Sequence, residues 1–211
     1  LNKVVALSND PHDWSGSVMD VAAYWTDVAY GNGEFVAVSN GANCAAVSTS
    51  LGRSWVTANN LPTSQDWTAI NFGNNQFVTV GNTNVGAMST DGVNWTQITL
   101  PVAQTWTDLA YGNNHWVAIA QNSSTAAVSS DGITWTASPM PSTQNWTAIT
   151  FGNGKFVAIG GTSSITATMM YSTNGATWTS VGALYPKNNS TYIKSVYYGN
   201  GNFVADHYGD S

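Results

Sequence analysis

The sequence predicts an all-β fold, a β-propeller of five four-stranded antiparallel sheets that close into a ring. Three observations lead to this prediction. One hairpin-forming unit occurs five times, a second hairpin unit accompanies each copy, and the two ends of the chain supply the two halves of one sheet. Repeats of about 40 residues are typical of propellers and solenoids, because each unit buries its apolar face against the next.

The first unit reads WTDVAYGNGEFVAV in its first copy and WTAITFGNGKFVAI in its fourth. Each copy contains two β-prone runs joined by Gly-Asn-Gly or Gly-Asn-Asn. Asn and Gly tolerate the positive φ of a tight hairpin turn, so the unit predicts a β-hairpin. The copies begin at Trp25, Trp67, Trp106, Trp146 and, in a diverged form, Tyr192.

The second unit has the skeleton Ser-x-Asp-Gly-x-x-Trp, as in Ser89 to Trp95 and Ser129 to Trp135. Asn174 replaces the acid in one copy, and the copy from Ser48 to Trp55 carries one extra residue and lacks the acid. An Asp or Asn side chain folds back on the turn backbone while Gly supplies the positive φ. We therefore expect a second hairpin, with its Trp anchored in the core.

The N-terminal segment contains Ser8, Asp10 and Trp14 at the same spacing as the second unit. Residues 1–24 are therefore expected to form the outer half of a sheet whose inner half is 192–206, which would close the ring and leave no exposed sheet edge. The whole chain, 1–211, is then one domain. Its expected sheets are 25–66, 67–105, 106–145, 146–191, and 192–211 together with 1–24.

Composition excludes several classes of function. Only 8% of the residues are charged and the net charge is −6, which argues against nucleic acid as a partner. No apolar run is long enough for a membrane span, so membrane insertion is not expected. Cys44 is the single cysteine and the three His do not cluster, so we expect no metal and no cofactor.

The second unit resembles the Asp-box, or BNR, motif of sialidase-like β-propellers, and the combined repeat looks like those of bacteriophage tail fibres and bacterial surface proteins. This resemblance implies a propeller fold. It also implies that the Asp-box is a turn device remote from any ligand, so that Asp10, Asp91 and Asp131 belong to turns.

The candidate site lies on the face formed by the second-to-third loops and the links between sheets, because these segments vary while the hairpin turns are uniform. Three links place a Gln two residues before a Trp. An aromatic face and an amide together suit a sugar. In the alternative, the Trp rings wedge between sheets and the Gln side chains satisfy link backbone. Asp27 and Asp108 are expected near the central channel of the ring, where they serve as hydrogen-bond acceptors for a ligand or only as polar lining. The candidate ligand-binding residues are Trp25, Trp67, Trp106, Trp146, Tyr192, Gln65, Gln104, Gln144, Asp27 and Asp108.

Catalysis is not expected. Arg53 is the only Arg, whereas a sialidase of this kind needs three, and Glu34 is the only Glu, so no carboxylate pair for glycoside hydrolysis stands out. The sequence instead predicts a non-catalytic recognition domain of a phage tail fibre or similar appendage, on a virion surface or outside the cell. Its partner is a cell-surface glycan or other host receptor. The alternative is a structural or protein–protein interaction module that binds other virion proteins or a surface layer.

Overall fold

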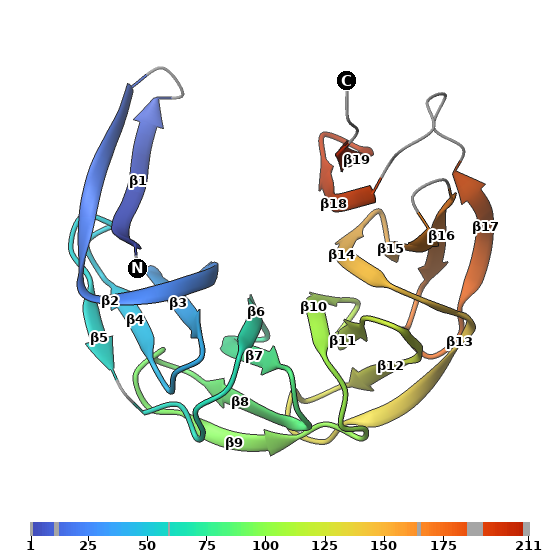
Figure 1. The fold of residues 1–211 in the computed structure, drawn as a ribbon, viewed down its shortest axis with the longest axis horizontal. Coiled ribbons are helices and arrows are strands. Elements are labelled where there is room, and N and C mark those ends of the chain that lie inside the picture. The colour runs from blue at the N-terminus through green and yellow to red at the C-terminus, as the bar shows by residue number, and fades with distance from the viewer. Residues whose placement is uncertain (1, 11–12, 59, 164–165, 185–191, 209–211) are drawn as a thin grey trace. The chain divides into compact units, whose positions relative to one another are not determined.

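The computed structural model describes residues 2–10, 13–58, 60–163, 166–184 and 192–208, and these contain strands and no helix (Figure 1). The all-β prediction is confirmed. The chain forms two compact units, Leu1–Ile98 (unit 1) and Thr99–Ser211 (unit 2).

Unit 1 contains two antiparallel sheets. The first has the order β1-β2-β3-β4-β5 and the second the order β6-β7-β8-β9. The strands are β1 (Asn2–Asp10), β2 (Asp13–Gly31), β3 (Glu34–Asn40), β4 (Ala45–Ser48), β5 (Val56–Ala58), β6 (Trp67–Gly73), β7 (Gln76–Gly81), β8 (Val85–Ser89) and β9 (Thr96–Thr99), the last of which crosses the boundary between the units.

Unit 2 contains two four-stranded sheets, β10-β11-β12-β13 and β14-β15-β16-β17, and the pair β18-β19. The strands are β10 (Trp106–Gly112), β11 (His115–Ala120), β12 (Ser123–Ser129), β13 (Thr136–Gln144), β14 (Trp146–Gly152), β15 (Lys155–Ser163), β16 (Thr166–Ser172), β17 (Thr179–Leu184), β18 (Tyr192–Gly199) and β19 (Asn202–Tyr208).

The hairpins predicted from Gly-Asn-Gly and Gly-Asn-Asn are confirmed in every copy. Asn32 and Gly33 both have positive φ, as do Asn113 and Asn114 in the third copy. The residue before each of these turns pairs with the residue after it, for example Gly31 with Glu34. One aromatic pair packs at the same place in each hairpin, with ring centroids 4.7 to 4.9 Å apart.

Neighbouring sheets within a unit pack face to face. In unit 1, Val36 and Val47 of the first sheet share a buried cluster with Trp67, Ile70 and Phe77 of the second. In unit 2, another cluster of aliphatic and aromatic side chains joins the sheet that begins with β10 to the sheet that begins with β14. Aliphatic side chains on one sheet therefore meet aromatic side chains on the next.

In three of the hairpins, the glycine at the end of the first strand accepts an aromatic ring from the next sheet. A Cβ atom at Gly112 would lie 2.1 Å from Cγ of Phe151, and one at Gly152 would lie 2.0 Å from Cγ of Tyr198. Gly31 stands in the same relation to Phe72 in unit 1, at 2.0 Å. Real Cβ contacts are never this short, so these positions require glycine because the ring occupies the space of a side chain.

The N-terminal segment forms the predicted hairpin, since β1 pairs with the first part of β2, from Val4 opposite Val18 to Asp10 opposite Asp13. However, β2 then continues without a break to Gly31 and pairs with β3, so that the first sheet has five strands. The reason is local: residues 18–24 contain no Gly, Pro or Asn to end a strand, whereas three other links contain Pro62, Pro101 or Pro141. Among the described residues, β18 pairs with β19 alone.

Candidate functional site

The tryptophan residues that begin the first strands are core residues. Trp67, Trp106 and Trp146 are fully buried, and Trp25 is half-buried. Trp67 packs against the first sheet, and Trp146 packs against Val117 and Ile119 of the preceding sheet. Trp146 also donates a hydrogen bond from Nε1 to the carbonyl oxygen of Ser123 at 3.0 Å. These three rings present no open face to a sugar. For Trp67 and Trp146, the geometry favours the alternative in which the rings wedge between sheets.

The glutamine side chains hold the links against loops of their own sheets. Gln65 donates from Nε2 to the carbonyl oxygen of Val85 at 2.8 Å and accepts a hydrogen bond from the Thr83 hydroxyl. Gln104 repeats this pattern, donating to the carbonyl oxygen of Thr125 and accepting from the Ser123 hydroxyl at 2.8 Å. Their amides are therefore occupied by the protein itself.

Gln144 differs from the other two glutamines, because it donates to the hydroxyl of Ser142 at 3.2 Å. Its backbone pairs with Ser123 at the end of β13. The Gln–x–Trp spacing thus gives two equivalent arrangements and one that departs from them.

Asp27 and Asp108 clamp neighbouring strands. Asp27 accepts backbone N–H groups with both oxygens, Oδ1 from Val28 and Oδ2 from Ile70 of the next sheet, each at 2.8 Å. Asp108 does the same with Leu109 and Ile149, again at 2.8 Å. Burial raises the pKa of Asp27, and the hydrogen bonds from the two backbone N–H groups oppose this shift. Each acid is therefore a structural acceptor within its own unit.

A threonine beside each acid adds a second clamp that the sequence analysis missed. Thr26 lies at a β-bulge in β2 and donates from Oγ1 to the carbonyl oxygen of Trp67 in the next sheet at 2.6 Å. Thr107 donates in the same way to the carbonyl oxygen of Trp146 at 2.8 Å. The signal was present in the sequence, since Thr follows the Trp in all four undiverged copies.

Tyr192 does not occupy the position of the Trp residues. The bulge in β18 lies between Ile193 and Ser195, as it lies between Trp25 and Asp27 in β2, so Ile193 is the equivalent of Trp25. Counting back six residues from the terminal glycine of each first strand gives the same answer. The side chain of Tyr192 is outside the described part of the structure.

The Ser-x-Asp-Gly-x-x-Trp segments form the turns that the sequence predicts. Asp91 accepts backbone N–H groups of Val93 and Asn94 on Oδ1, at 2.9 and 2.7 Å, and the Ser89 hydroxyl also donates to it. Trp95 donates from Nε1 to the carbonyl oxygen of Gly92 at 3.0 Å. The turns at Asp131 and Asn174 have the same contacts.

Hydrogen bonds from the turn backbone lower the pKa of Asp91 and lower that of Asp131 to about 2. A lowered pKa in the folded state stabilises the fold above the unfolded value of 3.8, and this stability is lost as the pH falls toward the folded value. We expect the D91N/D131N variant to show a smaller loss of unfolding free energy below pH 3.8 than the parent. Both carboxyls are exposed, so the cost at neutral pH should not exceed about 1 kcal/mol for each substitution.

Urea unfolding at a series of acid pH values measures this difference. Asn174→Asp is the matched control, because Asn174 holds the same turn through Oδ1 without a charge. With Asn174→Asp, the free energy of unfolding should fall more steeply as the pH decreases through the same range. An unchanged pH profile in both variants would contradict the assignment of these acids to the turn backbone.

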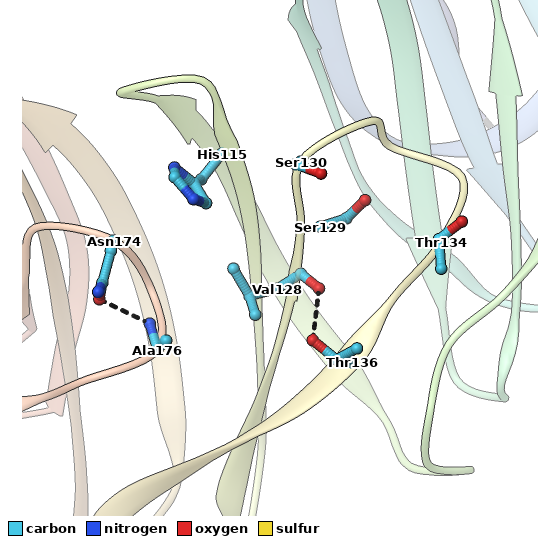
Figure 2. A pocket seen from close by; sticks show the side chains of 8 residues that line it. All are labelled: His115, Val128, Ser129, Ser130, Thr134, Thr136, Asn174 and Ala176. Carbon is cyan, nitrogen blue, oxygen red and sulfur yellow. Dashed lines mark hydrogen bonds between the residues drawn. The ribbon is translucent and has the colours of Figure 1, made fainter.

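A cavity of unit 2 lies between the turns of its two four-stranded sheets, and Figure 2 shows its lining. Its volume is about 330 Å³. Two Ser and two Thr supply hydroxyl groups beside apolar surface, and the lining contains no Asp, Glu, Lys or Arg. The lining residues are His115, Val128, Ser129, Ser130, Thr134, Thr136, Asn174 and Ala176.

Two side chains of this pocket keep polar atoms available. His115 contacts the carbonyl oxygen of Asn113 through Nδ1 at 2.7 Å, and because a carbonyl can only accept, Nδ1 carries the proton. In the neutral ring Nε2 is then an acceptor. Ser130 is exposed, and no hydrogen bond of its hydroxyl occurs among the described residues. The pocket therefore offers an acceptor and a hydroxyl to a neutral polar ligand.

From the sequence we expected a site on the face formed by the second-to-third loops and the links, whereas this pocket lies at hairpin turns. His115 follows the β10–β11 turn, and Ser130 belongs to the β12–β13 turn. Uniform turns gave no reason to expect a cavity there, because the cavity depends on how two sheets are spaced. The one available signal was His115, which replaces Glu, Gln or Lys of the other undiverged copies.

Unit 1 has a smaller cavity of about 240 Å³ on the first sheet, lined by Met19, Trp25, Thr26, Asp27, Val28, Ala37 and Trp55. It is mainly apolar, and both oxygens of Asp27 already accept hydrogen bonds. No group of three or more His, Cys, Asp or Glu side chains that could hold a metal occurs in the described residues. Nor does any helix there have the length and apolarity to cross a membrane.

Comparison with known proteins finds likeness in structure alone. No family model and no curated protein matches the sequence. Among solved structures, a virginiamycin B lyase from Staphylococcus aureus matches with a TM-score of 0.81 and 14% identity, over 98% of this chain and 77% of that one. A structure described as YCF48 bound to D1 peptide matches with a TM-score of 0.68 and 16% identity, over 93% and 66%.

A streptogramin B lyase structure gives a TM-score of 0.76 and 13% identity, over 90% of this chain and 65% of that one. This chain thus spans about two thirds of the length of two of these three proteins. At such identities the likeness concerns the fold only. The chain has an all-β, propeller-like fold of antiparallel sheets.

Proposed function

We propose that this chain is a non-catalytic recognition domain that binds a neutral carbohydrate in the pocket of Figure 2. The observation that supports it is the lining of that pocket, which combines hydroxyl groups, one imidazole acceptor and no charged side chain. Sugar hydroxyls both donate and accept, so they match such a surface. Of the residues first considered for this role, Trp67, Trp146, Asp27 and Asp108 contact neighbouring sheets, and Gln65 and Gln104 bond to loops of their own sheets.

The absence of a carboxylate in the lining supports binding without hydrolysis. Glycoside hydrolysis needs two carboxyl groups on either side of the scissile bond, and the lining residues contain neither Asp nor Glu. Likeness to lyases at 13% and 14% identity does not transfer their activity.

A glycan array probed with the parent and with the H115A/S130A variant tests the proposal. We expect at least one neutral glycan to bind the parent, with affinity reduced about tenfold or more in the variant, because two hydrogen bonds are lost. Ser50→Ala in the corresponding turn of the first sheet is a control outside the pocket. Binding that H115A/S130A leaves unchanged, or no binding to any glycan, would refute the proposal.

A polypeptide partner is the second candidate, because one structural neighbour is described as bound to a peptide. Hydroxyl groups and backbone groups of the turns line the pocket, and these can also form hydrogen bonds with an extended peptide. A peptide that competes for the parent and not for H115A/S130A would favour this candidate over a glycan.

We propose that the domain belongs to a phage tail fibre or a similar appendage, on a virion surface or outside the cell. There it would attach to a host receptor. Its support is the repetitive, weakly charged Asn- and Thr-rich sequence. Binding of the purified chain to whole bacterial cells, and loss of that binding after removal of their surface polysaccharide, is the expected result.

We further propose that the sheet predicted from both chain ends forms, giving five sheets in a closed ring. In the other sheets the second and third strands pair as Phe35 with Ser48 and Ala37 with Ala46. The same register would place Phe203 opposite Ser8 and Ala205 opposite Ala6. A disulfide between Ala6→Cys and Ala205→Cys in the monomer is expected, and failure to form it under oxidising conditions would contradict closure.

A further inference from the structure

Two departures from the repeat meet at the pocket beside His115. The other undiverged copies have Glu34, Gln76 or Lys155 at the position of His115, and two other turns have Asp at the position of Asn174. The histidine belongs to the sheet that begins with β10 and the asparagine to the sheet that begins with β14, yet both line the same cavity (Figure 2). An imidazole and a carboxamide thus distinguish this pair of turns from the others.

The side-chain amide of Asn174 has its nitrogen available to a ligand. Its Oδ1 accepts the backbone N–H groups of Ala176 and Thr177 at 2.9 and 3.0 Å, and because an N–H can only donate, the oxygen must face them. No hydrogen bond of the amide nitrogen Nδ2 occurs among the described residues. In unit 1, by contrast, the second oxygen of Asp91 accepts from the side chain of Asn94 at 2.8 Å.

Hydrogen bonds between the two sheets hold the histidine and the turn of the asparagine in place. Nδ1 of His115 donates to the carbonyl oxygen of Asn113 at 2.7 Å, and Nδ2 of Asn113 donates to the carbonyl oxygen of Thr173 at 3.0 Å. Ser138 donates from Oγ to the carbonyl oxygen of Gly175 in the same turn at 2.7 Å. A site that is fixed in this way loses little conformational freedom when a ligand binds.

A secondary amide is complementary to these two groups. Its N–H can donate to Nε2 of His115, and its carbonyl oxygen can accept from Nδ2 of Asn174. The methyl groups of Val128 and Ala176 line the same cavity, and they suit the methyl group of an N-acetyl substituent. A carboxylate in place of the carboxamide would instead present an acceptor to the carbonyl oxygen of the ligand, and neither could donate.

The corresponding positions in unit 1 have a different chemistry. Glu34 occupies the position of His115, and Asp91 occupies the position of Asn174. Oε2 of Glu34 is buried and has no hydrogen-bond partner among the described atoms, while Asp91 accepts hydrogen bonds from its own turn. Ionised carboxyl groups offer no donor to a carbonyl oxygen, so these turns do not provide the same site.

We propose that the pocket selects a neutral sugar that carries an N-acetyl group, with His115 and Asn174 holding the acetamido group. The inference rests on the function proposed above and names the class of carbohydrate. Ligand sites have volumes of about 300 to 1,000 Å³. The volume of this pocket, about 330 Å³, is at the small end of that range and suits one sugar ring better than an extended peptide.

Asn174→Asp tests the inference, because it replaces the donor by a carboxylate and keeps the turn, as Asp131 shows. The probes are the methyl glycosides of N-acetylglucosamine and N-acetylgalactosamine, each compared by NMR titration with the hexose that has a hydroxyl in place of the acetamido group. We expect the parent to bind one acetamido sugar about tenfold more tightly than its hexose, and Asn174→Asp to abolish this preference. Asp91→Asn makes the reverse exchange outside the pocket and should change neither affinity.

The outcomes distinguish this inference from the proposed function. Loss of the preference in Asn174→Asp, in a variant that still unfolds cooperatively, supports the inference. If both kinds of sugar bind the parent equally and H115A/S130A weakens both, the carbohydrate site stands and the preference for an N-acetyl group is refuted. A preference that survives Asn174→Asp also refutes it. If N-acetylglycine methylamide binds and no sugar does, or if neither binds, the carbohydrate site and the inference are both overturned.

Discussion

Trp146→Ala is expected to lower the free energy of unfolding by about 3 to 5 kcal/mol. Trp146 is fully buried, lies in the cluster that joins two sheets of unit 2, and donates a hydrogen bond to the carbonyl oxygen of Ser123. The alanine would leave a cavity and an unpaired carbonyl. Domains of this size have a stability of about 5 to 15 kcal/mol, so the variant should be at the limit of folding.

Urea unfolding followed by far-UV circular dichroism measures the effect. Trp146→Phe is the matched control, since it keeps most of the buried volume and loses the hydrogen bond, and it should cost clearly less. If Trp146→Ala left stability unchanged and abolished glycan binding, Trp146 would be a ligand residue and its placement in the core would be wrong.

Gly112→Ala is expected to destabilise the protein by about 1 to 3 kcal/mol or more, because the new methyl group overlaps the ring of Phe151. The Cβ atom would lie 2.1 Å from Cγ of Phe151. Backbone conformation is not the cause, since Gly112 is not among the glycines with positive φ. The junction between two sheets must therefore open for the residue to fit.

A double-mutant cycle with Phe151→Ala tests this cause. Removing the ring makes room for the methyl group, so Gly112→Ala should cost much less in the Phe151→Ala background than in the parent. Equal costs in both backgrounds would show that the ring is not what excludes a side chain at position 112.

The hairpins and turns could be predicted from the sequence because local chemistry determines them. Asn32 and Gly33 adopt the positive φ that their residue types favour, and Asp131 folds back on its own turn. These interactions span a few residues. A repeat that shows them five times leaves little doubt about its secondary structure.

The candidate site could not be predicted in the same way, because it depends on contacts between sheets. A Trp that begins a strand is compatible with a sugar-binding surface and with a wedge between sheets, and only its burial distinguishes the two roles. The pocket beside His115 arises from the spacing of two turns that are 44 residues or so apart in the chain, which no local pattern records.

The continuity of β2 is a feature that the repeat pattern did not predict. The repeat divides the chain at Trp25, yet the segment before it has no residue that ends a strand, and β2 runs through the division. The boundaries between repeats are defined by the repeated units, whereas a strand ends where Gly, Pro or Asn favours a turn.

Repeated Trp and Asp residues contact neighbouring sheets, and we propose that recognition occurs in the pocket beside His115. Backbone amide NMR of the parent, titrated with methyl glycosides of common neutral hexoses and N-acetylhexosamines, tests this division of roles. We expect the amide signals of His115, Ser130, Thr134 and Asn174 to shift on binding. Shifts confined to the links around Gln65 and Gln104 would contradict it.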